Sequence, residues 1–194
     1  MSIASFYDRS FEEFGDTHQA VGWFTENTQQ IRFLMLSLLT DWSKVSVLDV
    51  GCATGEFYTY LKARYPDVKY EGIDFSVKML EAARRKFPDT SFIQADFMTE
   101  KFKKTYDYVV ASGVFNHREQ APLMESAIKK MFALARKGVA FNALSSFTPE
   151  HQQDRKTFHY YDPLQIIRFS LTLTRFVEFK QSYLPNDFTV YLYR

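Results

Sequence analysis

The stretch VLDVGCATGEF, from Val47 to Phe57, constrains the fold of this chain more than any other segment. A short apolar run ends in Asp49, a turn flanked by Gly51 and Gly55 follows at once, and a helical pattern then begins. A buried parallel strand that breaks into a tight turn and opens a helix is the usual seat of a nucleotide-like ligand. The stretch therefore predicts a parallel sheet with a ligand site at the end of this strand.

Strand and helix patterns alternate along the chain, and their short connections favour a mainly parallel sheet covered by helices on both faces. The last two strand patterns are separated only by SYLPN, which is too short for a helical crossover, so they should be antiparallel. We therefore expect a three-layer α/β sandwich whose seven-stranded sheet contains one antiparallel strand near its end. The strands are expected at 45–50, 68–73, 91–95, 106–111, 139–144, 174–180 and 187–193, and helices at 56–65, 76–88, 122–138 and 164–170.

A single domain over residues 1–194 is expected, because the chain can bury one sizeable core and no linker or repeat interrupts it. Within that domain, residues 1–43 would form an N-terminal lid and helix, and residues 44–194 the core. The helix is predicted to begin at Asn27 with a capping box to Gln30.

The segment before this helix, residues 1–26, is aromatic and polar without a clear period, which fits either a lid or a frayed tail. Aromatic residues make up 18% of the chain. They indicate an aromatic-rich core or a pocket that cages a cation or a flat ligand.

Charge and cysteine content narrow the function. A net charge of +1 gives no electrostatic reason to expect nucleic acid or an anionic membrane as the main partner. The single cysteine, Cys52, excludes an intramolecular disulfide and a multi-cysteine metal site, and no metal is expected. The start of the chain lacks the apolar core of a signal peptide, and FLMLSLL is too short to span a bilayer, so we expect a cytoplasmic protein. The sequence leaves the oligomeric state open.

The glycine turn does not have the features of a phosphate site. Gly51, Ala53 and Gly55 give the spacing G-x-A-x-G, where a dinucleotide fingerprint needs a third glycine and a P-loop needs Gly-Lys-Ser/Thr. No basic residue lies between Lys44 and Lys62. These features favour a ligand with ribose, adenine and a cationic centre but without phosphates.

Three carboxylates follow successive strands: Asp49, Asp74 and Asp96. One such aspartate is usually a helix cap or a turn former. Because ligands bind at the carboxyl ends of parallel strands, three in succession favour a ligand site over a glycine turn without a ligand.

The motif D-V-G-C-A-T-G closely resembles the first motif of the class I S-adenosylmethionine-dependent methyltransferases, and the resemblance extends from residue 27 to the last strand. It implies a Rossmann-like fold and S-adenosyl-L-methionine as cofactor. In that family the glycine turn passes under the methionine part, Asp49 would support the turn and the cofactor's amino group, and Asp74 would hold both ribose hydroxyls. The turn corresponds to Gly51, Cys52, Ala53 and Gly55.

The same resemblance assigns further cofactor residues. Phe75 and Met79 would flank the adenine, Asp96 and Phe97 would lie at its edge, and Ser112 and Gly113 would bring backbone to the methionine part. Upstream, QQIRFLML is similar to the helix that small-molecule members of the trans-aconitate type place over the cofactor. Arg32 would bind the cofactor carboxylate there, or lie on a solvated helix face. Trp23 would close the lid on the ligands, or belong to the core.

The methyl acceptor is expected to meet two segments. The first, VVASGVFNHRE, supplies Asn116 as a substrate contact and His117 as a catalytic base or substrate contact, although a loop histidine is also an ordinary surface residue. The second, residues 145–163, contains FHYYDP, which supplies His159 and Tyr160 as substrate contacts and Tyr161 as a catalytic candidate. A base is needed only if the acceptor is protonated at the working pH.

Residues 145–163 and the N-terminal lid are short and form no separate substrate domain, which favours a small-molecule acceptor methylated on oxygen or nitrogen by in-line displacement. The Asn/Asp-Pro-Pro-Tyr/Phe motif of base amino-methylation is absent. Two alternatives remain: a non-catalytic S-adenosylmethionine-binding module that acts in a complex, and a nicotinamide-dependent reductase.

Overall fold

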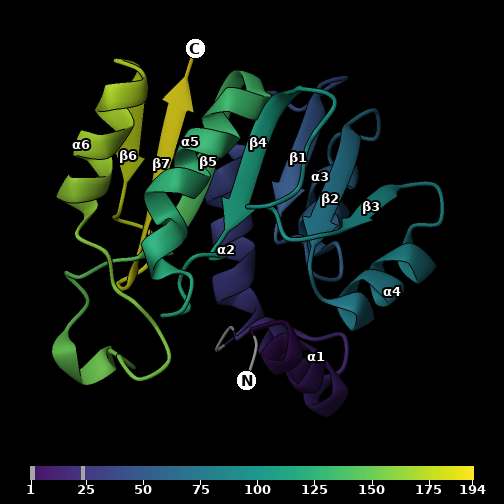
Figure 1. Cartoon of the computed structure of the whole chain (residues 1–194), viewed down its shortest axis with the longest axis horizontal. Coiled ribbons are helices and arrows are strands. Elements are labelled where there is room, and N and C mark those ends of the chain that lie inside the picture. The colour runs from purple at the N-terminus through teal and green to yellow at the C-terminus, as the bar shows by residue number, and fades with distance from the viewer. Residues whose placement is uncertain (1–2, 23–24) are drawn as a thin grey trace. The chain divides into compact units, whose positions relative to one another are not determined.

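The computed structural model describes residues 3–22 and 25–194, and the chain forms two compact units, Met1–Lys101 and Phe102–Arg194 (Figure 1). Trp23 lies outside the described residues, so its predicted role stays a prediction. None of the described helices is long and apolar enough to cross a membrane.

The first unit is built on three parallel strands in the order β3-β2-β1, with the central strand paired to both others. Both strands at the turn, β1 and β2, are largely buried, as expected for strands covered on both faces. The strands are β1 (Ser46–Val50), β2 (Lys69–Asp74) and β3 (Ser91–Gln94), and the helices are α1 (Ile3–Phe14), a 3-10 turn (His18–Val21), α2 (Glu26–Ser37), α3 (Glu56–Lys62) and α4 (Val77–Lys86).

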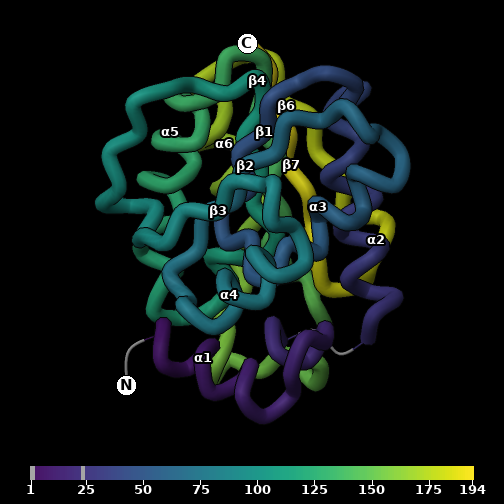
Figure 2. Tube along the Cα trace, turned by 90° about the vertical axis from the view of Figure 1, so that its right-hand side faces the viewer, coloured from purple at the N-terminus to yellow at the C-terminus, as the bar shows by residue number. Residues whose placement is uncertain are grey.

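The N-terminal helix α1 corrects the expectation for the first residues of the chain. Ile3, Phe6, Tyr7, Phe11 and Phe14 recur at spacings of three and four residues, which is the period of an amphipathic helix. Figure 2 shows α1 lying against α4, in agreement with the contacts between the two helices. The frayed-tail alternative is therefore wrong for the described part of this segment.

Helix caps explain where α2 and α4 begin. Ser76 caps α4, since its side chain accepts a hydrogen bond from the backbone N–H of Met79. The capping box predicted at Asn27 is wrong. Thr25 is the N-cap of α2, because its backbone is extended and its hydroxyl oxygen accepts from the N–H of Thr28.

The second unit contains four strands in the order β4-β5-β7-β6. β4 and β5 are parallel, whereas β7 is antiparallel to both β5 and β6, which confirms the single reversed strand predicted near the end of the chain. α5 packs against β4 and β5, and α6 packs against β6 and β7 (Figure 1). The elements are β4 (Tyr106–Ser112), a 3-10 turn (Ala121–Leu123), α5 (Met124–Leu134), β5 (Ala135–Leu144), a 3-10 turn (Glu150–Gln152), α6 (Pro163–Leu173), β6 (Val177–Lys180) and β7 (Asp187–Tyr193).

One predicted helix end is wrong. Gly138 was expected to close the helix before the fifth strand, but α5 ends at Leu134 and Gly138 lies inside β5. There it pairs with Tyr108 of β4 and Tyr193 of β7. The two neighbouring strands supply backbone partners on both sides, and this pairing extends β5 back to Ala135.

Candidate active site

The glycine turn is fixed to the end of the neighbouring strand. The backbone N–H groups of Gly51 and Cys52 both donate to the carbonyl of Ile73, at 2.8 and 3.2 Å. Gly51, Ala53 and Gly55 have φ angles of +70°, +47° and +82°. Only glycine adopts this region freely, which explains the glycines at positions 51 and 55. Ala53 holds the same conformation with a side chain, a departure that the sequence pattern did not reveal.

Cys52 has a packing role in the turn. An added Cβ at Gly72 of β2 would lie 2.5 Å from the Cys52 Sγ atom, so the thiol occupies the space that this glycine leaves. Burial, with Asp74 and Asp49 adding to it, raises the pKa of Cys52 well above its ordinary value. A buried thiol that stays protonated is inert as a nucleophile.

Asp74 lies at the end of β2 and faces the turn. Its Oδ2 accepts from the N–H of Ala53 at 3.0 Å, and its Oδ1 accepts from the N–H of Ser76 at 2.9 Å. Burial raises the pKa of Asp74, and the hydrogen bonds from Ser76 and Ala53 oppose that rise. The backbone N–H of Phe75 also donates to this carboxylate. A carboxylate has about four acceptor positions, and the capacity left after these three bonds is available to a ribose hydroxyl.

Asp49 is a second buried carboxylate in the same unit. It accepts a hydrogen bond of 2.5 Å from the Tyr70 hydroxyl. The pKa of Asp49 is raised to about 7, chiefly by burial and to a smaller extent by the charge of Asp74. The hydrogen bond from Tyr70 opposes this rise. A cationic ligand group would favour the ionised carboxylate, which fits the ammonium and sulfonium charges of S-adenosylmethionine.

The helix α1 brings two residues to this site that the sequence did not indicate. The Tyr7 ring lies 6.1 Å from that of Phe75, measured between centroids, and burial together with Asp74 raises the pKa of Tyr7 to about 12. The Ser76 hydroxyl donates to Oδ1 of Asp8 at 2.6 Å. The helical spacing of the apolar residues in α1 could have revealed the helix, but not its place beside Asp74.

The remaining cofactor candidates of the first unit differ in environment. Met79 and Phe97 are buried, whereas Asp96 is exposed and accepts from the N–H of Met98 at 2.8 Å. Arg32 is buried in α2, and its Nη1 donates to the carbonyl of Thr28, one turn earlier, at 3.0 Å. The structure thus brings together Asp49, the glycine turn, Asp74 and Phe75, while the roles of the others stay predictions.

In the second unit, the end of β4 is tied to β5. Gly113, with a φ of +65°, donates its N–H to the carbonyl of Asn142 at 3.3 Å. The Ser112 hydroxyl lies 3.5 Å from Oδ1 of Asn142. Asn116 is buried, and its Oδ1 accepts from the N–H of Leu144 at 3.0 Å, so this side chain holds the loop to the end of β5.

The two predicted acceptor segments lie side by side. His117 and Phe158 form an antiparallel bridge, and the N–H of His159 donates to the carbonyl of Asn116 at 2.7 Å. The Tyr161 hydroxyl donates to the carbonyl of Phe115 at 2.5 Å. Residues 112–118 and 145–163 are therefore tied to each other within the second unit, and Asn116, Tyr160 and Tyr161 are buried there.

The titratable side chains of residues 145–163 lie in different environments. Burial raises the pKa of Tyr161, which therefore stays protonated and serves as a donor. Partial burial lowers the pKa of His159, and the positive charges of Arg155 and Arg118 lower it further. The Tyr160 hydroxyl accepts from the N–H of Asp154 at 3.0 Å. The neutral form of His159 is thus favoured at neutral pH.

Comparison with known proteins identifies the class. Residues 47–138 match the family model described as a methyltransferase domain. Rv1506c of Mycobacterium tuberculosis, whose name assigns it provisionally to the methyltransferases, is 33% identical over 75% of this chain and 88% of its own length. Trans-aconitate 2-methyltransferase of Escherichia coli is 30% identical over 46% of this chain, which covers 37% of that enzyme.

Solved structures show the same fold. Magnesium protoporphyrin IX methyltransferase from Synechocystis, with bound SAH, superposes with a TM-score of 0.70 at 16% identity, over 98% of this chain and 94% of that one. The plantazolicin methyltransferase BpumL gives a TM-score of 0.69 at 13% identity, over 98% of this chain and 96% of that one.

The chain belongs to the class I S-adenosylmethionine-dependent methyltransferases. The predicted Rossmann-like fold with a seven-stranded, mainly parallel sheet is confirmed, and so are the cofactor, S-adenosyl-L-methionine, and the assignment as an enzyme. The nicotinamide-dependent reductase and the non-catalytic binding module no longer compete with this assignment.

Proposed function

We propose that this enzyme transfers the methyl group of S-adenosylmethionine to an oxygen or nitrogen atom of a small-molecule acceptor. The observation that carries the proposal is the contact between residues 112–118 and 145–163, two segments that carry aromatic and titratable side chains. Relatives named for trans-aconitate, a small tricarboxylate, support a small-molecule acceptor. In the displacement, a lone pair of the acceptor forms the new bond to carbon while the bond to sulfur breaks and its electrons return to sulfur.

The residues of this chain bind and align the reactants in that step. Asp74 holds the ribose hydroxyls, Asp49 faces the cofactor's ammonium group, and Phe75 lies along the adenine. Arg32 binds the cofactor carboxylate. The backbone conformation of the glycine turn allows the methionine part to approach closely. The other proposed cofactor contacts are Met79, Asp96, Phe97, Ser112 and Gly113.

On the acceptor surface, His117 and Tyr161 are the proposed catalytic groups. Tyr161 keeps its proton and orients the loop through the Phe115 carbonyl, so proton removal falls to His117 when the acceptor carries a proton. Asn116, His159 and Tyr160 line the acceptor, and Trp23 is a further proposed substrate contact.

We also propose a domain organisation, a cellular location and a class of partner. Residues 1–194 form one methyltransferase domain, which the family match supports because it extends across the boundary between the two units. A cytoplasmic location is supported by the single, buried, reduced cysteine. The net charge of +1 supports a partner other than nucleic acid or a membrane.

A product assay tests the proposed function. The purified enzyme is incubated with S-adenosylmethionine and a panel of small carboxylates, phenols and amines, and S-adenosylhomocysteine is quantified. We expect turnover with at least one compound and none with Asp74→Asn at the same cofactor concentration. Cofactor binding in the wild type, together with methyl transfer only to protein or RNA, would overturn the proposal.

A further inference from the structure

Asn142, in β5, carries a buried donor that the fold leaves unused. Only 3% of the residue is exposed, and its Nδ2 has no hydrogen-bond partner within residues 3–22 and 25–194. Buried amides in native proteins are almost always paired, so an unused one at a strand end calls for an explanation such as a ligand. No sequence motif marks this residue as functional.

The rest of Asn142 is already engaged. Its backbone carbonyl accepts from Gly113, and its Oδ1 lies 3.5 Å from the Ser112 hydroxyl. Both partners belong to the end of β4, where the methionine part of the cofactor and the acceptor are proposed to meet. These contacts orient the planar amide and leave the Nδ2 arm as its free donor.

Thr189, the residue that pairs with Asn142 on β7, connects it to the loop between β6 and β7. Thr189 of β7 pairs directly with Asn142, so the two side chains share one face of the sheet. The hydroxyl groups of Tyr183 and Thr189 lie 2.8 Å apart, and Nε2 of Gln181 donates to Oγ of Ser145 at 3.1 Å. The loop is therefore held to Thr189 of β7 and to Ser145, the residue after β5.

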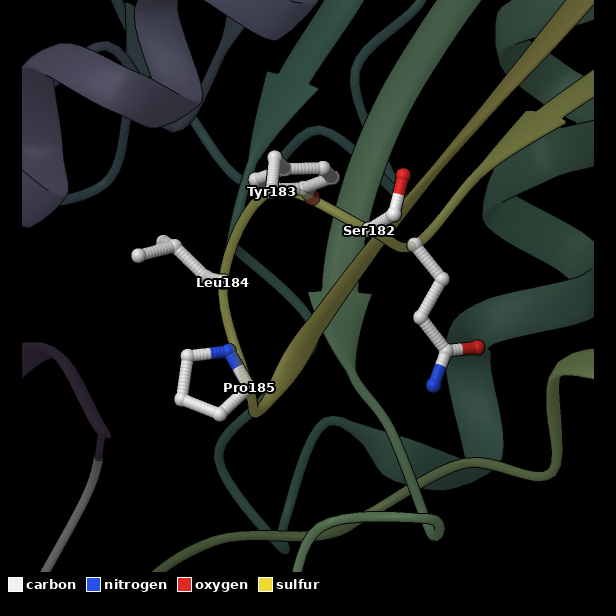
Figure 3. Close-up of a pocket in the computed structure, with 5 residues that line it drawn as sticks. Ser182, Tyr183, Leu184 and Pro185 are labelled. Carbon is white, nitrogen blue, oxygen red and sulfur yellow. The ribbon is translucent and has the colours of Figure 1, made fainter.

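This loop also borders a hollow. Residues 181–185 line an open depression of about 380 Å³. Figure 3 shows Tyr183 lying toward the strands, while Leu184 extends away on the outer side of the loop. Tyr183 thus joins the hollow to the sheet face that carries Thr189 and Asn142.

We propose that Nδ2 of Asn142 donates a hydrogen bond to an oxygen of the methyl acceptor, in a subsite whose wall is the 181–185 loop. This inference rests on the proposed small-molecule activity and narrows its substrate class. A buried amide donor requires an acceptor lone pair, which a carbonyl or carboxylate oxygen always presents, so we infer that the methyl acceptor carries such an oxygen beside the reacting atom. A small amine without such an oxygen lacks this anchor.

The test compares two substitutions of Asn142 with a matched control. Asn142→Leu removes the donor at similar volume, and Asn142→Asp replaces the donor with an acceptor. Ser170→Ala is the control, because the Ser170 hydroxyl is also buried without a partner in the described part of the chain but lies in α6. Binding of trans-aconitate, malonate, benzoate and benzylamine to the SAH-saturated enzyme is measured by calorimetry and thermal shift.

We expect at least one carboxylate to bind the wild type, and Asn142→Leu to weaken that binding by about tenfold or more, as for the loss of a hydrogen bond to a charged group. Asn142→Asp should weaken it further, while Ser170→Ala leaves it unchanged. Binding of SAH should change less than about threefold in all variants. Ligand-free Asn142→Leu should melt close to the wild type, because the loss of the long bond from Ser112 to Oδ1 is offset by the removal of an unpaired buried donor.

Three results would overturn the inference. Carboxylate binding that is equal in the wild type and Asn142→Leu would remove the donor from the acceptor site. A tenfold loss of SAH affinity in Asn142→Leu would assign the amide to the cofactor. Binding or turnover of benzylamine alone would reject an oxygen-bearing acceptor while leaving the proposed methyltransferase function intact, whereas absence of any small-molecule turnover would reject that function itself.

Discussion

The backbone N–H of Ala53 donates a hydrogen bond of 3.0 Å to Oδ2 of Asp74. This bond links the glycine turn after β1 to the carboxylate at the end of β2, so the two parts of the proposed cofactor site are positioned by each other. It also helps to hold Ala53 at a φ of +47°, a conformation that costs an L-residue about 1 kcal/mol.

Replacing Ala53 by glycine should therefore stabilise the protein. We expect Ala53→Gly to raise the free energy of unfolding by up to about 1 kcal/mol, because the left-handed strain disappears while the Asp74 bond remains. The measurement is chemical denaturation of the ligand-free enzyme. Gly51→Ala, at a φ of +70°, is the reverse control and should destabilise. A lower stability of Ala53→Gly would show that the strain is not stored at this position.

Asp74→Asn should weaken S-adenosylmethionine binding by about ten- to a hundredfold, because the amide presents a donor where the carboxylate accepts from ribose hydroxyls. Calorimetric titration with S-adenosylmethionine measures the loss. Asp89→Asn removes the same charge from an exposed turn after α4 and should bind as the wild type does. Unchanged affinity in Asp74→Asn would place the ribose elsewhere.

Cofactor binding should depend on pH through Asp49, whose pKa is about 7 in the ligand-free enzyme. A nearby cation favours the ionised carboxylate, so affinity should fall by up to about tenfold per pH unit below pH 7 and level off above pH 8. Binding at pH 7 should also release protons, which calorimetry in buffers of different ionisation enthalpy detects. Asp49→Asn should remove both effects, and a proton release equal to that of the wild type would contradict the assignment.

The raised pKa of Asp49 has the opposite effect on folding stability, which falls as the pH rises. Because the pKa of Asp49 is raised on folding, the folded protein binds more protons than the unfolded chain between about pH 4 and pH 7. The contribution of Asp49 to stability is fully present below pH 4 and is lost as the pH rises through 7. Relative to Asp49→Asn, the ligand-free wild type should therefore lose stability from pH 5.5 to pH 8 in denaturation curves. A difference that stays constant over this range would refute the raised pKa.

Ser76→Ala should destabilise the first unit and loosen α1. The hydroxyl caps α4 at Met79 and donates to Asp8, and loss of an N-cap costs about 0.5–2 kcal/mol. Thermal denaturation measures the stability, and limited proteolysis measures cleavage between α1 and α2. Ser91→Ala, at the exposed start of β3, is the control and should change neither. Unaltered proteolysis in Ser76→Ala would show that other contacts hold α1, such as the ion pair between Glu12 and Lys78.

Local sequence patterns determined much of the secondary structure of this protein. The run that ends in Asp49, the glycine turn and the following helix were predictable, because a continuous apolar run, a need for positive φ and a 3.6-residue period leave direct marks in sequence. The reversed final strand followed from the shortness of SYLPN. The helix α1 left such a mark too, in the spacing of its apolar residues, and the aromatic content of the segment obscured it.

The tertiary structure alone decided which side chains share an environment. The positions of Tyr7 and Asp8 beside Asp74, the raised pKa of Asp49, and the unused Asn142 amide beside Thr189 all depend on pairings between distant parts of the chain. The extension of β5 through Gly138 was also set by its two neighbouring strands. Backbone periodicity is a local property, whereas burial and hydrogen-bond satisfaction are known only once strands and loops are packed together.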